Sequence, residues 1–403
     1  MASHAQGFPA GKAQLSGELQ VSVIIPCLNE AATIACCVHK ARSALAQEGI
    51  AGEVIVIDNG STDDSVSIAE RAGARVVVMS ACRGYGCAVR AGIFAARGRY
   101  VVMGDGDGSY DFCEMPAFLA RLRAGCHLVM GTRLRGTILA GAMPPLHRWL
   151  GVPLLTALGN CFFGTRLSDY HCGLRAFERQ AIERLGLRTM GMEFATEMIA
   201  KAALHGLVID EVPITYYPDG RSRPSHLRTW RDGWRHLVLL LLLSPRWVFL
   251  YPGFVLLLLG LLGSIWLLPG PRMIGSVGFD VHTLLVSGVA VILGAQVLTL
   301  WLCAQLFAGI SGLLPISRLS RFLMERFSLG AGLALGTALA AIGLVLLGWS
   351  LGMWANVDFG ALDYQVALRR LIPGLVLLAL GIHGFFASFI ISLLTFKTRV
   401  ERQ

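Results

Sequence analysis

The chain has 403 residues, 54% of them hydrophobic, and a mean hydropathy of +0.60, which excludes an ordinary soluble protein of this length. Its formal net charge of +9 is spread along the chain without a dense basic stripe. We therefore expect no nucleic-acid partner, but phosphate substrates or an anionic membrane surface. Residues 247–403 hold only nine of the 35 Lys and Arg and five of the 26 Asp and Glu, as expected for a soluble domain followed by a membrane domain.

Residues up to about 217 alternate short apolar runs with stretches of helical character. The runs predict strands at 21–26, 53–57, 75–79, 100–103, 127–131 and 207–217. The stretches between them predict helices that begin at Asn29 or Glu30, after an N-cap at Ser61 or Thr62, at Gly84, near Met115 and at Gly191. Strands and helices that alternate at this spacing predict an α/β fold with a doubly wound, mostly parallel sheet.

The strand at 100–103 ends at two carboxylates, each followed by a glycine. Asp105 and Asp107 are two residues apart, so on extended backbone both point to one side, just beyond the C-terminal end of the strand. Open α/β sheets bind ligands there, and two carboxylates suit Mg²⁺ or Mn²⁺, which shares its other positions with water and substrate phosphates. These residues alone leave a solvated Asp-Gly turn as an alternative.

Two segments near the end of this domain have the composition of membrane-surface structures. Residues 144–163 are apolar and aromatic but are interrupted by Pro153 and Gly159. They predict either an interfacial segment or a core helix with a loop. Residues 219–247 combine six arginines with three tryptophans, which predicts an interfacial anchor directly before the first hydrophobic span.

Four stretches without Asp, Glu, Lys or Arg follow, each long enough to cross a bilayer at about 20 residues: 247–268, 283–310, 327–357 and 371–396. The basic segments after the second and fourth stretches lie on the same side as the arginine-rich segment before the first. The positive-inside rule makes that side cytoplasmic. We therefore predict an integral inner or plasma membrane protein with the catalytic domain and both termini cytoplasmic. Arg369 and Arg370, on the opposite side, depart from the rule.

The expected organisation has four parts: a disordered tail at 1–18, an α/β domain at 19–226, an amphipathic juxtamembrane helix at 227–246 and a transmembrane domain of four helices at 247–403. The ten cysteines show no C-x-x-C pairs, and we expect them to be buried, reduced thiols.

Several motifs, in this order and spacing, resemble those of family 2 glycosyltransferases of GT-A fold. They are IPCLNE at 25–30, IDNGSTDD at 57–64, the D-x-D of Asp105 and Asp107, GTR at 131–133, DYHCGLRAF at 169–177 and PDGRSRP at 218–224. With the membrane tail, the chain is similar to the polyprenyl-phosphate sugar transferases, such as dolichyl-phosphate mannose and glucose synthases. The resemblance covers about residues 20–246 and implies a GT-A domain there.

The resemblance also implies roles for particular residues. The expected donor-nucleotide contacts are Pro26, Asn29, Glu30, Asp58, Asn59, Arg83, Gly84, Asp105 and Gly106. The expected metal ligands, for Mg²⁺ or Mn²⁺, are Asp105, Asp107 and, where the family often carries Gln, Ser109. The expected contacts to the acceptor phosphate are Arg133, Arg221, Ser222 and Arg223. Asp107 and Arg133 are the expected catalytic residues.

Three further residues are weighed as candidates. Glu193 and Glu197 are spaced i, i+4 in a predicted helix, and we expect one of them to contact sugar hydroxyls. His171, next to Asp169, is interpreted as a structural turn histidine. A lipid phosphate acceptor is already anionic near neutral pH, so a general base is not required.

These patterns predict an inverting transfer of glucose or mannose from a nucleotide-sugar, UDP-glucose or GDP-mannose, to a polyprenyl phosphate at the cytoplasmic membrane face. Membrane lipid is the second expected partner, and a homo-oligomer is compatible with the sequence. A processive polysaccharide synthase is the alternative, but its Q-x-x-R-W motif has no counterpart around Leu227 to Trp230. A membrane scaffold or flippase-like protein with a transferase-like domain is a third possibility, against which the intact aspartates argue.

Overall fold

The computed structural model describes residues 19–79, 83–221 and 228–400, with side chains described up to residue 396. The predicted tail at 1–18 and the predicted phosphate contacts Ser222 and Arg223 lie outside the described residues. The chain divides into two compact units, Met1–Leu239 and Leu240–Gln403.

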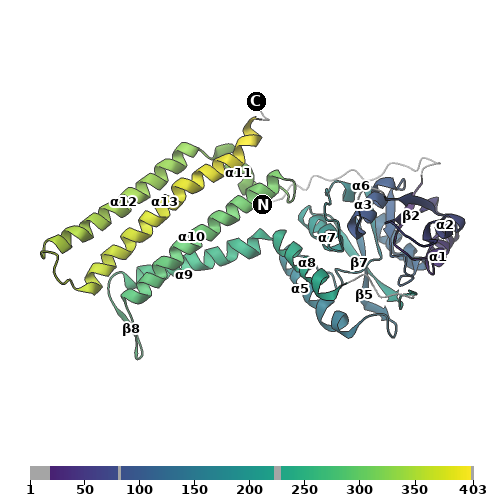
Figure 1. The fold of residues 1–403 in the computed structure, drawn as a ribbon, viewed down its shortest axis with the longest axis horizontal. Helices are drawn as coiled ribbons and strands as arrows, with labels where there is room; N and C mark the ends of the chain where they lie inside the picture. The colour runs from purple at the N-terminus through teal and green to yellow at the C-terminus, as the bar shows by residue number, and fades with distance from the viewer. Residues whose placement is uncertain (1–18, 80–82, 222–227, 401–403) are drawn as a thin grey trace. The chain divides into compact units, whose positions relative to one another are not determined.

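The first unit is built on one seven-stranded sheet (Figure 1). Its strands are β1 (Val21–Cys27), β2 (Gly52–Asp58), β3 (Arg75–Val78), β4 (Tyr100–Met103), β5 (Leu128–Ile138), β6 (Arg175–Glu178) and β7 (Ile209–Tyr216). Their order across the sheet is β3-β2-β1-β4-β6-β5-β7. Among these described strands only β6 runs antiparallel to its neighbours, so the predicted doubly wound, mostly parallel α/β fold is confirmed.

Helices cover both faces of this sheet. One face carries α1 (Ile34–Gln47), α2 (Ser65–Arg71) and α4 (Met115–Arg123), and the other carries α3 (Tyr85–Ala95), α6 (Arg179–Glu183) and α7 (Phe194–Leu204). Alternate residues of a strand enter the two cores: Val23 packs in the first and Ile24 in the second. Burial on both faces is the reason that the strands read as continuous apolar runs in the sequence.

Three predicted helix starts are wrong. Helix α7 begins at Phe194 instead of Gly191. Helix α1 begins at Ile34 instead of Asn29 or Glu30, and α2 has its N-cap at Asp64 instead of Ser61 or Thr62. The polar residues before α1 and α2 bond to the opposite loop: the Asn29 amide N–H donates to Ser61 Oγ, and the Thr62 amide N–H donates to Asn29 Oδ1. These residues, which the local sequence marks as helix caps, instead make hydrogen bonds between the loops after β1 and β2.

The two predicted membrane-surface segments are both helical in the structure. Residues His147–Gly151 form a π-helical turn that leads into α5 (Val152–Phe163), and residues Thr229–Leu242 form α8. The large side chains of Trp149, in the π-helical turn, and Trp230, in α8, are 75% and 80% exposed. Their location at the membrane stays a prediction.

The expectation of buried, reduced thiols is wrong for several cysteines. Cys87, near the start of α3, is disulfide-bonded. Cys36, Cys113 and Cys161 are free but exposed.

The second unit contains four helices that are long and apolar enough to cross a membrane, as the sequence predicts (Figure 1). They are α9 (Tyr251–Leu267) together with the π-helical turn Arg246–Leu250 before it, α10 (Val281–Ile310), α12 (Leu329–Ala355) and α13 (Tyr364–Val400). The connections hold a hairpin of β8 (Arg272–Ile274) and β9 (Val277–Phe279) and an amphipathic helix α11 (Arg318–Arg326).

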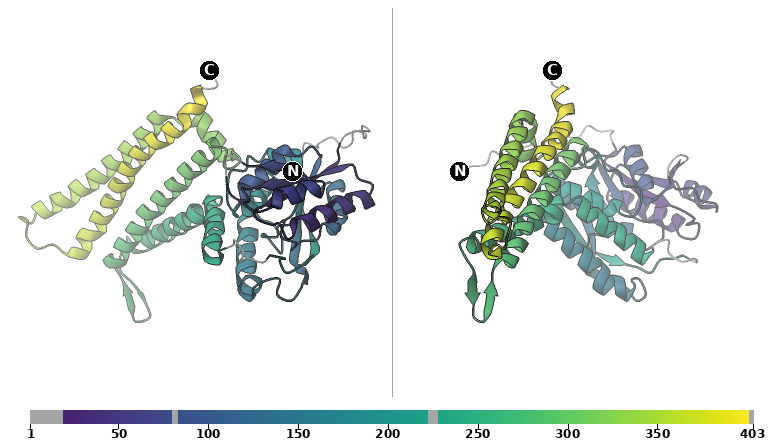
Figure 2. Two further views of the ribbon diagram at one scale, coloured as in Figure 1. Left: turned by 45° about the vertical axis from the view of Figure 1, so that its right-hand side comes forward. Right: turned by 60° about the vertical axis from the view of Figure 1, so that its left-hand side comes forward.

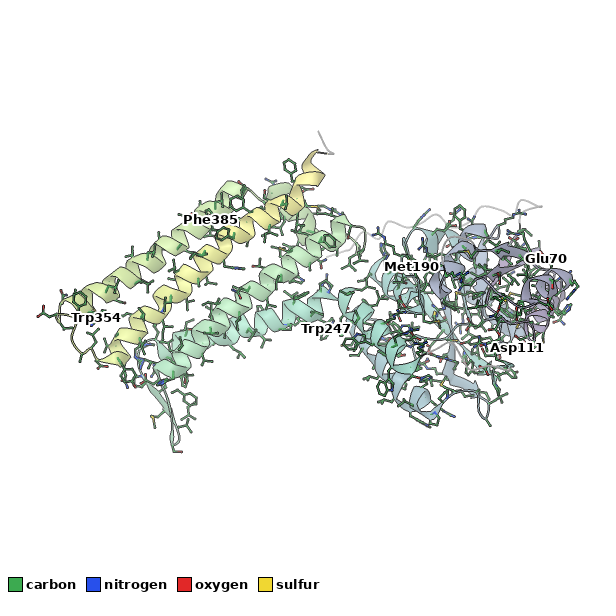
Figure 3. The ribbon with its side chains drawn as sticks, in the orientation of Figure 1. Glu70, Asp111, Met190, Trp247, Trp354 and Phe385 are labelled. Carbon is green, nitrogen blue, oxygen red and sulfur yellow. The ribbon has the colours of Figure 1, made fainter. Side chains whose placement is uncertain are left out.

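Helices α12 and α13 lie side by side along much of their length (Figure 2). Glycines allow the close approach: a Cβ on Gly381 would lie 2.3 Å from Ala340 N, and one on Gly336 would lie 2.6 Å from the backbone N of Phe385, labelled in Figure 3. Small residues at such positions favour helix association in membranes, where the hydrophobic effect between helices is lost.

Arg369 joins three helices of this unit. Its guanidinium donates to the Leu267 carbonyl oxygen at the end of α9, at 2.8 Å, and forms an ion pair with Asp280 before α10. The ion pair with Asp280 offsets the charge of Arg369, one of the two arginines that depart from the positive-inside rule.

Candidate active site

The predicted donor residues follow neighbouring strand ends. Strand β1 lies between β2 and β4 and is parallel to both, so the C-terminal ends of all three strands meet at one edge of the sheet. Asn29 and Asp105 lie in the loops after β1 and β4, and Asp58 is the last residue of β2. The topology thus brings three sequence-distant motifs to the position where doubly wound sheets bind ligands.

The loops after β1 and β2 hold each other in place. Asn29 has a φ of 56°, in the left-handed region that asparagine tolerates better than most residues. The buried Asp58 carboxylate accepts from the backbone N–H groups of Gly60, at 3.2 Å, and Ser61, at 3.1 Å. Both predicted nucleotide contacts therefore shape the loops, and their contact with a nucleotide stays a prediction.

The loop before α3 completes this side of the site. The Gly84 amide N–H donates to Asn59 Oδ1 at 3.1 Å, and the Arg83 guanidinium lies 3.5 Å from the position of a Cβ on Gly60. Gly84 has a φ of 136°, and a Cβ there would lie 2.4 Å from the carbonyl oxygen of Met190, which Figure 3 labels. Glycine is therefore required at this position.

The D-x-D loop presents its two aspartates differently. Asp107 Oδ1 accepts from the Ser109 hydroxyl at 2.6 Å and from the Ser109 amide at 3.0 Å. Asp105 Oδ1 is buried and has no hydrogen-bond partner. Gly108, which separates Asp107 from Ser109, has a φ of 79° and turns the chain sharply after the second aspartate. Ser109 thus positions Asp107, and its role as a metal ligand stays a prediction.

This pair of carboxylates fits a divalent cation. Burial, and then the charge of the neighbouring Asp107, raise the pKa of Asp105 to about 6. Two adjacent carboxylates, one with an unpartnered buried oxygen, are stabilised by a cation between them. Within the described parts of the chain, no three Cys, His, Asp or Glu side chains converge on one point, so such an ion would complete its shell with water and substrate oxygens.

Arg221 lies on the donor side of the site. Its guanidinium pairs with Glu30 Oε1 at 2.8 Å and with Asp107 Oδ2 at 3.1 Å. The backbone before it is bonded to the D-x-D loop, since the Gly220 amide donates to the Asp107 carbonyl oxygen at 2.9 Å. The predicted acceptor-phosphate arginine thus contacts one predicted metal ligand and one predicted donor residue.

Arg133 is held by a buried carboxylate. Its Nε and Nη2 donate to Asp169 at 2.7 and 2.9 Å, and its guanidinium lies over the Tyr216 ring, 5.2 Å from the centroid. Asp169 is fully buried; burial alone would raise its pKa, but the Arg133 guanidinium outweighs this effect and keeps the pKa low. The pair fixes one orientation of the guanidinium fork.

The two candidate sugar-binding glutamates differ in their surroundings. Glu197 is buried, pairs with Lys201 at 2.8 Å and accepts from the backbone amides of Arg188 and Thr189. Glu193 is the N-cap residue of α7 instead of lying inside the helix, and its Oε2 is buried without a partner. Glu197 is therefore engaged in structural contacts, and the role of Glu193 as a sugar contact stays a prediction.

Sequence reasoning missed one feature, around His171. Among the described residues, neither of its buried ring nitrogens has a hydrogen-bond partner, so the hydrogen bonds expected of a structural turn histidine are absent there. Its ring meets that of His236, from α8, edge-on at 4.6 Å. The adjacency of His171 to Asp169 was the only available signal, because His236 is 65 residues away in the sequence.

The fold and the site define an integral membrane protein with an α/β catalytic domain. The family model "Glycosyl transferase family 2" matches residues 22–186, and the model "Glycosyltransferase family 2 C-terminal transmembrane region" matches residues 302–395. The low-salt glycan biosynthesis hexosyltransferase Agl6 of Haloferax volcanii is 37% identical over 378 residues, which cover 92% of this chain and 88% of that protein. The chain belongs to glycosyltransferase family 2, and the predicted family and fold are confirmed.

Other relatives match a smaller share of the chain. A dolichyl-phosphate hexose transferase of Haloferax volcanii is 34% identical over 41% of this chain and 69% of that protein. The dolichyl-phosphate beta-glucosyltransferase of Saccharomyces cerevisiae is 27% identical over 50% of this chain and 67% of that protein. Among solved structures, glucosyl-3-phosphoglycerate synthase from Mycobacterium tuberculosis, in complex with Mn²⁺, uridine-diphosphate-glucose and phosphoglyceric acid, has a TM-score of 0.45, with 26% identity over 56% of this chain and 79% of that chain. That overlap is too loose to support an argument about function.

Proposed function

We propose that this glycosyltransferase transfers glucose or mannose from a nucleotide-sugar to a polyprenyl phosphate at the cytoplasmic membrane face, with inversion. The observation that carries the proposal is the meeting of two carboxylates, Asp105 and Asp107, with Arg221 at the strand ends of a membrane-anchored domain. The names of the dolichyl-phosphate relatives support the lipid acceptor.

Asp105 and Asp107 would hold Mg²⁺ or Mn²⁺ against the diphosphate of the donor. When bound, the cation neutralises negative charge that develops on the leaving diphosphate. The ion pair with Asp107 keeps the positive charge of Arg221 at the same place. Arg221 would bind a donor phosphate by giving up its contact with the Asp107 carboxylate. The acceptor phosphate needs orientation more than deprotonation, and the fixed guanidinium of Arg133 supplies an oriented donor for it.

The acceptor is a membrane lipid, and the first unit has a face suited to the membrane surface. Trp149, next to α5, and Trp230 and Trp234, on α8, are 75%, 80% and 65% exposed. His147 Nε2 and Thr229 Oγ1, 2.9 Å apart, join the two elements. Exposed tryptophans of this kind favour the membrane–water interface, so we infer that this face rests on the bilayer.

The charge distribution supports a cytoplasmic catalytic domain. Arg318, Arg321 and Arg326 lie on α11, between the second and third spans. On the opposite side, the positive charge of Arg369 is paired with Asp280. The connections on that side hold Arg272, Arg369 and Arg370, fewer than the basic residues of α11, the segment 219–247 and the tail after the fourth span together. The positive-inside rule therefore makes the side of α11 cytoplasmic.

The test is transfer of labelled sugar by the purified full-length protein. Radiolabelled UDP-glucose or GDP-mannose is incubated with undecaprenyl or dolichyl phosphate and Mg²⁺ or Mn²⁺, and label that enters the organic phase is counted. Asp107→Ala should abolish this label, whereas Asp111→Asn, a control four residues along the same loop, should keep most of it. No organic-extractable label with any donor refutes the proposal, and a lipid-free polymer would indicate the processive alternative.

A further inference from the structure

Buried polar atoms without partners are concentrated at one place in this protein. Eight side-chain nitrogen or oxygen atoms are buried without a hydrogen-bond partner among the described residues, and five of them belong to Asp105, His171, Arg175 and Glu193. Native proteins leave few such atoms, and a group of them indicates a place where a ligand supplies the missing hydrogen bonds.

These residues belong to one neighbourhood. Arg175 Nη2 donates to the carbonyl oxygen of Cys172, next to His171, at 2.6 Å, and its Nη1 donates to the carbonyl oxygen of Ala195, next to Thr196, at 3.2 Å. Gly173, two residues after His171, lies against Asp105 Oδ2, since a Cβ on this glycine would be 2.6 Å from that oxygen. The turn that carries His171 therefore contacts the predicted metal-binding carboxylate.

The same turn also contacts the predicted acceptor side. The His171 amide donates to Asp169 Oδ1 at 3.0 Å, and the Asp169 carboxylate holds Arg133. His171 thus lies between a donor-side carboxylate and an acceptor-side arginine. The group that is transferred between these two sides is the sugar.

The position of the His171 ring is set by its neighbour from α8. The His236 ring packs edge-on against it at 4.6 Å, and His236 Nδ1 and Thr196 Oγ1 are 2.7 Å apart. The Thr196 amide donates to the Glu193 carbonyl oxygen at 3.0 Å, so Glu193 precedes by one helical turn the residue that bonds His236. Helix α8 therefore contributes one wall of the neighbourhood.

The chemistry of the pair suits a hydroxyl group better than a phosphate. Burial lowers the pKa of His236 to about 4 and lowers that of His171 well below its ordinary value, so both rings are neutral at pH 7. A neutral imidazole has one donor and one acceptor nitrogen, and both of those of His171 have no partner. A sugar hydroxyl both donates and accepts, whereas a phosphate would favour a cationic ring.

We propose that His171 hydrogen-bonds a hydroxyl of the transferred hexose and helps to select the sugar, with Glu193 as a second sugar contact and His236 as the positioning residue behind it. This inference rests on the proposed function, since it takes the hexose of a nucleotide-sugar as the ligand. It adds that sugar recognition is built partly from α8, the helix that precedes the membrane spans.

The test compares binding of a nucleotide-sugar with binding of its nucleoside diphosphate, without any acceptor. Calorimetry on the full-length protein with Mg²⁺ uses UDP-glucose against UDP and GDP-mannose against GDP. His171→Phe keeps the ring packing against His236 but removes both nitrogens. It should weaken the nucleotide-sugar by about three- to tenfold, the range for one lost hydrogen bond, and leave the nucleoside diphosphate within about twofold.

Two further variants and a control sharpen the comparison. His171→Asn restores a donor and an acceptor and should recover part of the lost affinity. His236→Phe, which loses the bond to Thr196, should weaken the nucleotide-sugar less than His171→Phe. His205→Ala, an exposed histidine after α7, should leave both affinities unchanged.

Two results would overturn the inference: equal weakening of both ligands by His171→Phe, or weakening of neither. The proposed function fails separately. A sugar-specific loss in a protein that transfers to no polyprenyl phosphate would keep the role of His171 and refute the acceptor.

Discussion

Replacing Asp169 by asparagine should destabilise the protein strongly, because it leaves the Arg133 charge buried without a counter-charge. The Arg133 and Asp169 side chains are 9% and 0% exposed, and their two charge-assisted bonds are 2.7 and 2.9 Å long. Removing one partner of such a buried pair costs about 3–5 kcal/mol. Asparagine keeps one acceptor oxygen, so we expect a value near the lower end of that range.

The matched control is Glu178→Gln, the same carboxylate-to-amide change in a surface pair. Arg99 and Glu178 are 3.5 Å apart, with side chains 67% and 29% exposed, and such pairs contribute about 0–1 kcal/mol. For a domain of this size each kcal/mol shifts Tm by roughly 2–4 °C, so Asp169→Asn should lower Tm by roughly 6–15 °C and the control by only a few degrees.

The assay is thermal unfolding of the purified full-length protein in detergent at pH 7. The pKa of Asp169 is held below its ordinary value by Arg133, so the stabilisation by this pair is complete above pH about 4 and is lost only as the pH falls further. Equal shifts of Tm in the two variants at pH 7 would refute the reasoning, because burial would then not distinguish the pairs.

Three further outcomes follow from other contacts. The pKa of His236 in the folded protein, about 4, lies below the ordinary value of 6.5, so the stability of the fold is greatest above pH 6.5 and falls as the pH drops from 6.5 towards 4. His236→Asn should flatten the dependence of Tm on pH in that window, and an unchanged slope would contradict this prediction. Arg369→Met should lower Tm by several degrees without changing nucleotide affinity, because it leaves Asp280 unpaired. The double variant with Asp280→Asn should recover part of the lost Tm, and a loss of nucleotide affinity would count against a purely structural role for Arg369. Gly381→Leu should separate α12 from α13 and lower the yield of folded protein in detergent, because the new Cβ would lie 2.3 Å from Ala340 N. A normal yield would show that the two helices can shift apart.

Much of the fold could be predicted from local sequence. Apolar runs located β1, β2, β3, β4 and β7 to within a few residues, because strands buried on both faces have few polar positions to interrupt them. Strand β5 was located less well, since it continues to Ile138, beyond its predicted end at residue 131. Helix starts were less predictable. Asn29 and Ser61 look like capping residues, but they bond to each other across the site, and only the parallel pairing of β1 with β2 brings them together.

In the candidate site, too, some features could be predicted from the local sequence and others could not. The D-x-D carboxylates could be located from spacing, because two aspartates that follow a buried strand lie at the edge where doubly wound sheets bind ligands. The separation of Glu193 from Glu197 could not, because i, i+4 spacing is the same for both, and only Lys201 and two backbone amides mark Glu197 as structural.

The sequence by itself determined that this protein has a parallel α/β domain, a carboxylate pair at a strand end and four apolar helices, because each of these is written in the periodicity and charge of one continuous segment. Only the tertiary structure decided that Arg221 pairs with Asp107, that Asp169 fixes Arg133, and that His171 meets His236. These contacts join residues 36 to 114 positions apart, and whether a polar side chain is paired, buried or left without a partner depends on what the folded chain brings against it.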